Sequence, residues 1–182
     1  FAINSESSEK TADNISVEIE DSNLAKRYVA RIIKNVTVKE SPKWLKERVE
    51  SIGIRSINNI VDASNFIMME LNQPNHTFDL DKIEGGKIVV RAGHENEKLV
   101  TLDEQERELN SDDIVISDGV KAVALGGVMG GQNSEITENT KNILLEVANF
   151  NSQNVRKTSR RLTLFSESSY RFERRVDEEN AI

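Results

Sequence analysis

Residues 143–147 have the sequence Ile-Leu-Leu-Glu-Val, a short apolar run that is typical of a buried β-strand. Successive side chains of a strand point to opposite faces, so Leu144 and Glu146 share one face and the other three residues share the second. If Leu144 faces a core, Glu146 faces it too, and a buried carboxylate is costly unless it is paired or hydrogen-bonded. Glu146 is therefore either an edge residue exposed to water or a carboxylate placed to accept a hydrogen bond from a ligand hydroxyl.

The chain that precedes this strand is also predicted to be rich in β-structure. A strand-like pattern runs over residues 15–38 and is most apolar at 28–33. Asp118-Gly119 is a strong signal for a two-residue hairpin between two further strands. Short apolar or alternating runs predict strands at 87–91, 98–102, 114–117 and 120–124.

A helix is predicted over residues 42–52, where the local signals are clearest. Ser41 supplies an N-cap, Pro42 stands at the first helical position, and Gly53 follows the last turn. The apolar face of this helix consists of Leu45, Val49 and Ile52. Two more helices are predicted after the buried strand, one from 151 to about 160 and one that begins near 167 and continues past 176.

A further helix is predicted from about residue 57 to residue 71. Ser64 falls on its apolar stripe, with Asn65 beside it. A polar side chain in that position either bonds back to the preceding turn or lines a polar cavity. The stripe repeats at three- and four-residue spacing and consists of Ile57, Ile60, Val61, Met68 and Leu71.

The net charge of −7 argues against a domain that grips nucleic acid over its whole surface. The charge is uneven, because residues 156–175 carry +5 and the remainder carries −12. This basic segment is either a solvated helical face with ordinary ion pairs or a local phosphate contact. The candidate RNA contacts are Arg156, Lys157, Arg160 and Arg161.

The composition excludes several kinds of site. The chain has no cysteine, which rules out disulfides and thiolate metal sites, and its two histidines, His76 and His94, lack the spacing of metal ligands. We therefore expect no metal. No stretch approaches the roughly 20 apolar residues that cross a bilayer, and no secretory signal is recognised, so a reducing cytoplasm is the simplest compartment.

A length of 182 residues suits one sizeable domain or two small subdomains that share a core. Residues 1–14 are polar and predict a mobile linker, which leaves 15–182 as the folded domain, either as one unit or as two interleaved subdomains. The first residue is not Met and the last residues carry no closing signal. We expect the chain to be a fragment of a longer polypeptide.

Two further features indicate chemistry. The segment 125–131 has four glycines within six residues, which permits either a tight bulge at a sheet corner or a close approach of a ligand to backbone N–H groups. It lacks the Gly-Lys-Ser/Thr that ends a phosphate-binding P-loop. His76 is predicted to lie in a loop after Pro74, where it is either a surface residue or a group that exchanges a proton near neutral pH.

Four motifs occur in an order that closely resembles the editing region of bacterial phenylalanyl-tRNA synthetase beta subunits. They are Asn59-Ile60-Val61-Asp62-Ala63-Ser64-Asn65-Phe66, Leu71-Asn72-Gln73-Pro74-Asn75-His76-Thr77-Phe78-Asp79, Gly126-Gly127-Val128-Met129-Gly130-Gly131 and Ser166-Glu167-Ser168-Ser169-Tyr170-Arg171-Phe172-Glu173-Arg174. The resemblance runs from about residue 41 to residue 177. It implies an α+β fold, a helix-packed β-sandwich of unusual topology.

The resemblance also implies a deacylase that hydrolyses tyrosine wrongly attached to tRNA(Phe), within an enzyme that ligates phenylalanine to this tRNA. A pocket that requires the tyrosine hydroxyl rejects phenylalanine, because its buried polar groups would otherwise stay unpaired. No cofactor is implied in this domain, and ATP and Mg²⁺ would serve the aminoacylation site of the parent enzyme. The implied partners are the 3′ end of tRNA(Phe), the tyrosine moiety and the alpha subunit of an α2β2 heterotetramer, and no membrane.

The roles of individual residues follow from the same resemblance. Glu146 would accept the hydrogen bond of the tyrosine phenol, and the backbone N–H of Gly127 would contact the same oxygen. His76 would lie near the scissile ester, where it either assists proton transfer to or from the attacking water or only orients the terminal adenosine. Pro74 would shape the wall; Ser64 and Asn65 would lie near the amino-acid and ribose end, and Ser166 and Ser168 would bound the pocket.

The sequence departs from the family pattern at several of these positions. Ser168 stands where alanine is common, Ser64 and Ser166 where threonine is common, Tyr170 where histidine is common and Arg175 where glycine is common. The departures motivate one alternative, a tRNA-contacting or subunit-packing module that has lost editing. A second alternative is an unrelated small-molecule enzyme that uses Glu146 as a base.

Overall fold

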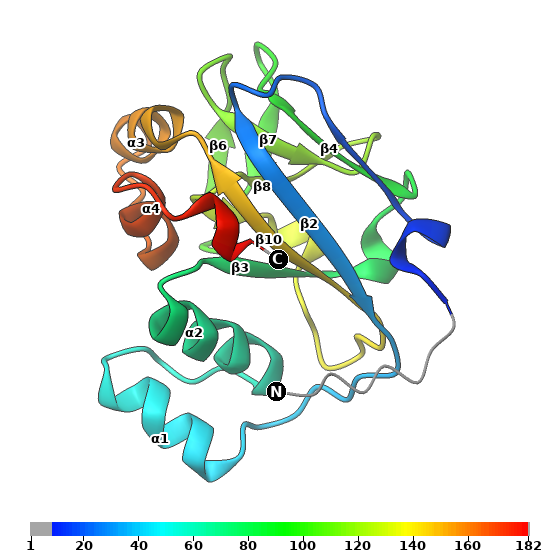
Figure 1. Ribbon diagram of the computed structural model, residues 1–182, viewed down its shortest axis with the longest axis vertical. Helices are drawn as coiled ribbons and strands as arrows, with labels where there is room; N and C mark the ends of the chain where they lie inside the picture. Colours follow the sequence, from blue (N-terminus) through cyan, green and yellow to red (C-terminus); the bar gives the residue numbers. More distant parts are fainter. Residues whose placement is uncertain (1–8, 182) are drawn as a thin grey trace.

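A computed structural model describes residues 9–181, and in this part of the chain two β-sheets enclose one apolar core, with helices along one side (Figure 1). The larger sheet has the strand order β1 (Ser16–Ile19), β4 (Lys87–Ala92), β7 (Ile114–Ser117), β8 (Ala122–Leu125) and β9 (Met129–Gly130). In this sheet β1 and β4 are parallel, and the other neighbours are antiparallel. A short pair, β5 (Lys98–Val100) and β6 (Glu106–Glu108), stands apart from it.

The smaller sheet has the apolar run at residues 143–147 in its central strand. Its order is β2 (Ala25–Ile33), β10 (Ile143–Phe150) and β3 (Asn75–Asp79), all antiparallel. The prediction that Leu144 and Glu146 share a buried face is confirmed, because both side chains are buried whereas Leu145 and Val147 are only partly covered. Since β10 is flanked by a strand on each side, Glu146 does not lie at a sheet edge.

The core explains why the two sheets stay together. Tyr28, Phe78 and Leu144 of the smaller sheet belong to the same buried cluster as Ile88 and Val115 of the larger sheet. Burial of such side chains contributes roughly 1.5–3 kcal/mol each. The α+β fold class expected from the sequence is confirmed.

The predicted two-residue hairpin at Asp118-Gly119 is wrong. Ser117 pairs with Ala122, so four residues connect β7 and β8. The cause is the buried Asp118 carboxylate, whose Oδ1 accepts hydrogen bonds from the N–H groups of Val120 and Lys121 at 2.9 and 2.8 Å. These bonds occupy backbone donors that the expected strand 120–124 needs for its ladder.

The first predicted helix is confirmed as α1 (Lys43–Ser51), but its start differs from the prediction. Pro42 occupies the cap position without a side-chain cap, and the Ser41 hydroxyl instead donates to the buried Asp62 carboxylate. Leu45 and Val49 are buried as expected, whereas Ile52 is exposed.

The second helix, α2 (Asn59–Leu71), begins at the N-cap Asn58, whose side chain accepts from the N–H groups of Ile60 and Val61. Its predicted buried stripe is largely wrong, because Ile57 is 64% exposed and Leu71 is 58% exposed, and only Met68 of the stripe is fully buried. The helix packs against α1 and β3 and leaves an open groove toward the smaller sheet, so periodicity overstated its burial.

The last two helices are α3 (Ser152–Arg161), capped by Asn151, and α4 (Glu167–Phe172). The prediction that the last helix continues past residue 176 is wrong. The chain leaves the helix because Arg175 has a left-handed backbone, with φ of 68°. Residues 1–8 of the predicted linker lie outside the described part of the chain; within residues 9–14, Thr11–Asp13 form a 3-10 turn, and Thr11 Oγ1 accepts from the N–H of Ile32.

We expect Arg175→Gly to stabilise the fold by about 0.5–1 kcal/mol. A non-glycine residue in this conformation costs roughly 1–2 kcal/mol, which glycine avoids at an entropic cost of about 0.5–1 kcal/mol. Urea unfolding measures the change. Arg175→Ala is the matched control, because it removes the exposed side chain but keeps the backbone strain. Equal gains for both variants would contradict the conformational cause.

Candidate functional site

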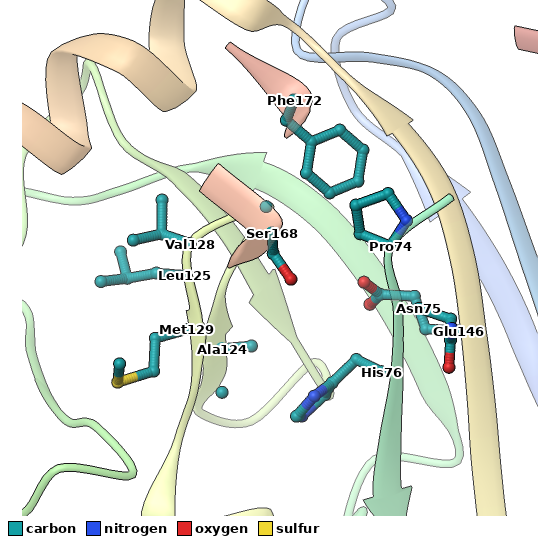
Figure 2. Close-up of a pocket in the computed structure, with 12 residues that line it drawn as sticks. Pro74, Asn75, His76, Ala124, Leu125, Val128, Met129, Glu146, Ser168 and Phe172 are labelled. Atoms are coloured by element: carbon teal, nitrogen blue, oxygen red, sulfur yellow. The ribbon is translucent and has the colours of Figure 1, made fainter. Parts of the chain in front are cut away.

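A narrow pocket lies where the smaller sheet, the glycine-rich hairpin and α4 meet (Figure 2). Its free volume is about 50 Å³, which is room for a few water molecules. The side chains that surround it come from segments that are distant in sequence, including Pro74, His76, Glu146, Ser168 and Phe172.

Glu146 is the acidic side chain of the pocket, and it is 7% exposed. The hydroxyl of Tyr28, on β2, donates a hydrogen bond of 2.6 Å to Oε2 of Glu146. Burial raises the pKa of Glu146 to about 7, although the hydrogen bond from Tyr28 acts in the opposite direction. The carboxyl can therefore be charged or neutral close to physiological pH.

His76 lies directly across the sheet from Glu146. The prediction that His76 lies in a loop is wrong, because His76 belongs to β3, which begins right after Pro74. In the sheet, His76 of β3 pairs with Glu146 of β10. Burial lowers the pKa of His76 to about 4, so the imidazole is neutral at pH 7. Its ring meets Phe78 edge-on at 4.6 Å, and it lies so close to Gly130 that a Cβ there would come within 2.5 Å of Cε1.

The glycine-rich segment is a tight hairpin between β8 and β9, in which Leu125 pairs with Met129. Gly127, at its tip, has φ of 74° and lines the pocket. The N–H groups of Gly126 and Val128 donate to the carbonyls of Ile114 and Leu125, whereas the N–H of Gly127 has no acceptor among residues 9–181. Gly127 thus offers a free backbone donor at the pocket.

The amino-terminal end of α4 is tied to this hairpin. Ser166 caps the helix by accepting from the N–H of Ser169, and its own hydroxyl donates to the carbonyl of Val128 at 2.7 Å. Ser166 does not line the pocket, whereas Ser168 does and also contacts Sδ of Met68 at 3.7 Å. Of the two serines expected to bound the pocket, one therefore lies in its wall and the other holds the wall in place.

Ser64 and Asn65 do not line this pocket. Ser64 donates to Oδ1 of Asn75 at 2.6 Å, and the Asn75 amide donates back to the Ser64 carbonyl at 3.1 Å, which fastens α2 to β3. Ser64 faces a larger groove of about 330 Å³ on the outer face of the smaller sheet. That groove is lined mainly by aliphatic side chains and has no titratable group, so the smaller pocket is the candidate site.

The four basic residues of α3 behave in two ways. Lys157 pairs with Asp112 at 2.9 Å, and Arg161 pairs with the buried Asp113. Arg156 and Arg160 are exposed and form no ion pair within the described part of the chain. Two guanidinium groups on one helix face are thus available to an anion, and the other two residues support the fold.

Sequence reasoning missed three members of the site. The sequence places Tyr28 only in an apolar strand, and it places Phe172 and Asn75 only in motifs of the resemblance. The alternation of β2, which places Tyr28 on the same side as Ala30, was a usable signal for an inward-facing hydroxyl. In residues 9–181, no group of three or more acidic or His side chains could hold a metal ion, and no helix is long and apolar enough to cross a membrane.

We expect the Glu146 carboxyl to make the fold more stable at acidic than at alkaline pH. Because folding raises its pKa from 4.5 to about 7, its contribution of about 3 kcal/mol is complete below pH 4.5 and is lost as pH rises through 7. His76 acts with the opposite sign, since its lowered pKa gives stability that is lost as pH falls from 6.5 toward about 4. Urea unfolding near pH 5 and near pH 8 tests this. Between these two pH values, the free energy of unfolding of Glu146→Gln should rise by about 2–3 kcal/mol relative to that of the parent. No relative rise would contradict a buried carboxyl.

Comparisons with known proteins show which proteins this chain resembles. A family model described as the B3/4 domain matches residues 24–182. The chain is 54% identical to the phenylalanine–tRNA ligase beta subunit of Fusobacterium nucleatum, over 91% of this chain and 21% of that protein. It is 52% identical to the corresponding protein of Bacillus subtilis, over 93% of this chain and 21% of that protein. The chain therefore spans about a fifth of the length of these relatives.

A solved structure resembles the fold. It is an N-terminal fragment of the phenylalanyl-tRNA synthetase beta subunit from Pyrococcus horikoshii, with a TM-score of 0.55 and 15% identity. The match covers 74% of this chain and 43% of that one. At this level of identity, the likeness concerns the fold alone.

Proposed function

Because this chain belongs to the B3/4 domain family, we propose that it is the editing module of a phenylalanyl-tRNA synthetase beta subunit and hydrolyses the ester of mischarged tyrosyl-tRNA(Phe). The parent enzyme would ligate phenylalanine to tRNA(Phe) with ATP and Mg²⁺ at a separate site. Its alpha subunit and the 3′ end of the tRNA are the partners that this proposal requires.

One observation carries the proposal: a nearly buried carboxylate and a free backbone donor meet in one narrow pocket. Glu146 can accept a hydrogen bond from a phenol hydroxyl, and the N–H of Gly127 can donate to the phenol oxygen. Phenylalanine has no group that satisfies either of them. A site built around a substrate hydroxyl rejects the analogue without it by a large factor, because its own polar groups stay unpaired.

The proposed reaction needs no covalent intermediate. Water attacks the carbonyl carbon of the aminoacyl ester, the bond from that carbon to the ribose oxygen breaks, and the ribose hydroxyl leaves with the proton. At neutral pH the His76 imidazole is unprotonated and can accept a hydrogen bond from the water or from the terminal ribose. Positioning of the ester against water is the main contribution that these residues can make.

The tRNA itself would approach an acidic domain, so its contacts must be local. Arg156 and Arg160 supply positive charge on α3 that no ion pair compensates among residues 9–181, and α3 precedes α4 and its pocket residue Ser168. Phosphate contacts of this kind weaken as the salt concentration rises. This part of the proposal concerns affinity for the tRNA and not the choice between amino acids.

Single-turnover deacylation by the synthetase that contains this chain tests the proposal. The substrates are tyrosyl-tRNA(Phe) and phenylalanyl-tRNA(Phe), each followed with saturating enzyme. We expect the tyrosyl ester to be cleared at least 100-fold faster than the phenylalanyl ester, which corresponds to about 2.8 kcal/mol. Equal rates, or a faster phenylalanyl ester, would reject editing as the function.

A second candidate function rests on the narrowness of the pocket. With about 50 Å³ free and a Ser168 hydroxyl in the wall, the module could have kept the fold for tRNA contact or subunit packing and lost hydrolysis. The same assay separates the two functions, because a non-catalytic module leaves tyrosyl-tRNA(Phe) at the uncatalysed rate. Ser168→Ala then tells whether the extra hydroxyl is the cause, since its removal should restore clearance.

A further inference from the structure

Tyr28 is the side chain that holds Glu146. Within residues 9–181, the Tyr28 hydroxyl donates the only side-chain hydrogen bond that Glu146 receives, at 2.6 Å to Oε2. Tyr28 is 9% exposed and does not line the pocket, whereas Glu146 does. The hydroxyl therefore reaches the carboxylate from outside the pocket and does not compete with a ligand for space.

The position of the Tyr28 ring is fixed by other aromatic rings. It meets Phe150 edge-on at 6.4 Å, and Phe150 meets Phe172 in the same manner at 5.2 Å. Phe172 in turn lines the pocket. Edge-to-face contacts of this type favour one ring orientation, so the Tyr28 hydroxyl is directed at a defined point.

In the hydrogen bond between Tyr28 and Glu146, the proton belongs to the Tyr28 hydroxyl. Burial raises the pKa of Tyr28 well above 10, so the phenol remains a donor at any physiological pH. A carboxylate has two oxygens, and in the described part of the chain only Oε2 of Glu146 has a donor. The other oxygen, Oε1, is left to accept a hydrogen bond from a group that enters the pocket.

We propose that Tyr28 is a positioning residue that holds Glu146 by Oε2 and presents Oε1 to the phenol hydroxyl of the aminoacyl group. The inference rests on the proposed editing function and extends it, because it traces the selection of a hydroxylated ring to a hydroxyl of the protein itself. Tyr28 acts through Glu146 and does not touch the substrate.

Tyr28→Phe tests this inference because it removes one oxygen and keeps the ring. Without its donor, the carboxyl can rotate and its pKa rises further, since the bond from Tyr28 holds that pKa down. The neighbouring titratable group on β3, His76, is neutral at pH 7 and adds no charge beside the carboxyl. The bond to the substrate phenol then loses its charge, and charge-assisted bonds are about twice as strong as neutral ones.

In the whole synthetase, we expect Tyr28→Phe to lower the ratio of kcat/KM for tyrosyl-tRNA(Phe) over phenylalanyl-tRNA(Phe) by about tenfold. The pH at which the tyrosyl reaction reaches half of its maximal kcat/KM should also move upward. Tyr170→Phe is the matched control, because it makes the same change on the other tyrosine of the chain, which is exposed. In a Glu146→Gln background, Tyr28→Phe should change the ratio by less than about twofold.

The outcomes separate the inference from the function on which it rests. If the parent enzyme shows no preference for the tyrosyl ester, the proposed function fails. If the parent prefers it and Tyr28→Phe keeps both the ratio and the pH profile, only the inference is overturned. Equal slowing of both esters, with an unmoved pH profile, also overturns it, because that pattern describes a purely structural role.

Discussion

Replacing Glu146 with alanine should lower kcat/KM for tyrosyl-tRNA(Phe) by about 100-fold and leave the rate for phenylalanyl-tRNA(Phe) nearly unchanged. A hydrogen bond to a charged group contributes roughly 1.5–3 kcal/mol, and alanine also leaves the substrate phenol without an acceptor in the pocket. About 2.8 kcal/mol corresponds to a factor of 100. Single-turnover deacylation with both esters measures the effect.

Glu146→Gln is the matched control for this prediction. It keeps the shape of the side chain and an acceptor oxygen but removes the charge, so a loss of roughly tenfold is expected. A graded series, with the parent fastest and alanine slowest, supports direct recognition of the phenol. If both variants clear the tyrosyl ester as fast as the parent, Glu146 has no part in the reaction.

Gly127→Ala should lower the free energy of unfolding by about 3 kcal/mol and abolish clearance of the tyrosyl ester. The left-handed backbone of Gly127 costs any other residue roughly 1–2 kcal/mol. A Cβ here would also lie 2.9–3.2 Å from side-chain atoms of Val155, Phe172 and Phe150, and such crowding typically costs about 1–3 kcal/mol. Since Phe172 lines the pocket, its displacement alters the site as well as the core.

The chain offers a control that separates backbone strain from crowding. Gly53 has φ of 81°, but a Cβ added to it meets nothing within 4 Å. Gly53→Ala should therefore cost only about 1 kcal/mol in urea unfolding and leave deacylation intact. If the two alanine variants lose equal stability, the close packing around Gly127 has no energetic weight.

The strands with an apolar core run were predictable because their signal is local. The apolar runs at 143–147 and 114–117 predict buried strands, and both are strands in the structure. The failures arose where a tertiary contact overrides a local pattern. Asp118 takes backbone donors from the expected strand, and the exposed Leu71 shows that a helical stripe need not meet a partner.

The candidate site was predictable only in part. Glu146 was found by a physical contradiction, a charge within an apolar run, and Gly127 by the density of glycines. His76 needed the resemblance, because nothing local distinguishes a strand histidine from one in a loop. The bond from Tyr28 to Glu146 joins residues 118 positions apart, so no sequence window could contain it.

The span of these contacts sets a lower limit on how the domain can be dissected. Tyr28 lies in β2 and Phe172 at the end of the last α-helix, yet ring contacts through Phe150 connect them beside the pocket. A fragment that starts after Tyr28 lacks the hydrogen-bond donor to Glu146, and one that ends before Phe172 lacks a residue that lines the pocket. The bond from Tyr28 to Glu146 and the ring contacts from Tyr28 through Phe150 to Phe172 therefore require both ends of this span in one folded unit.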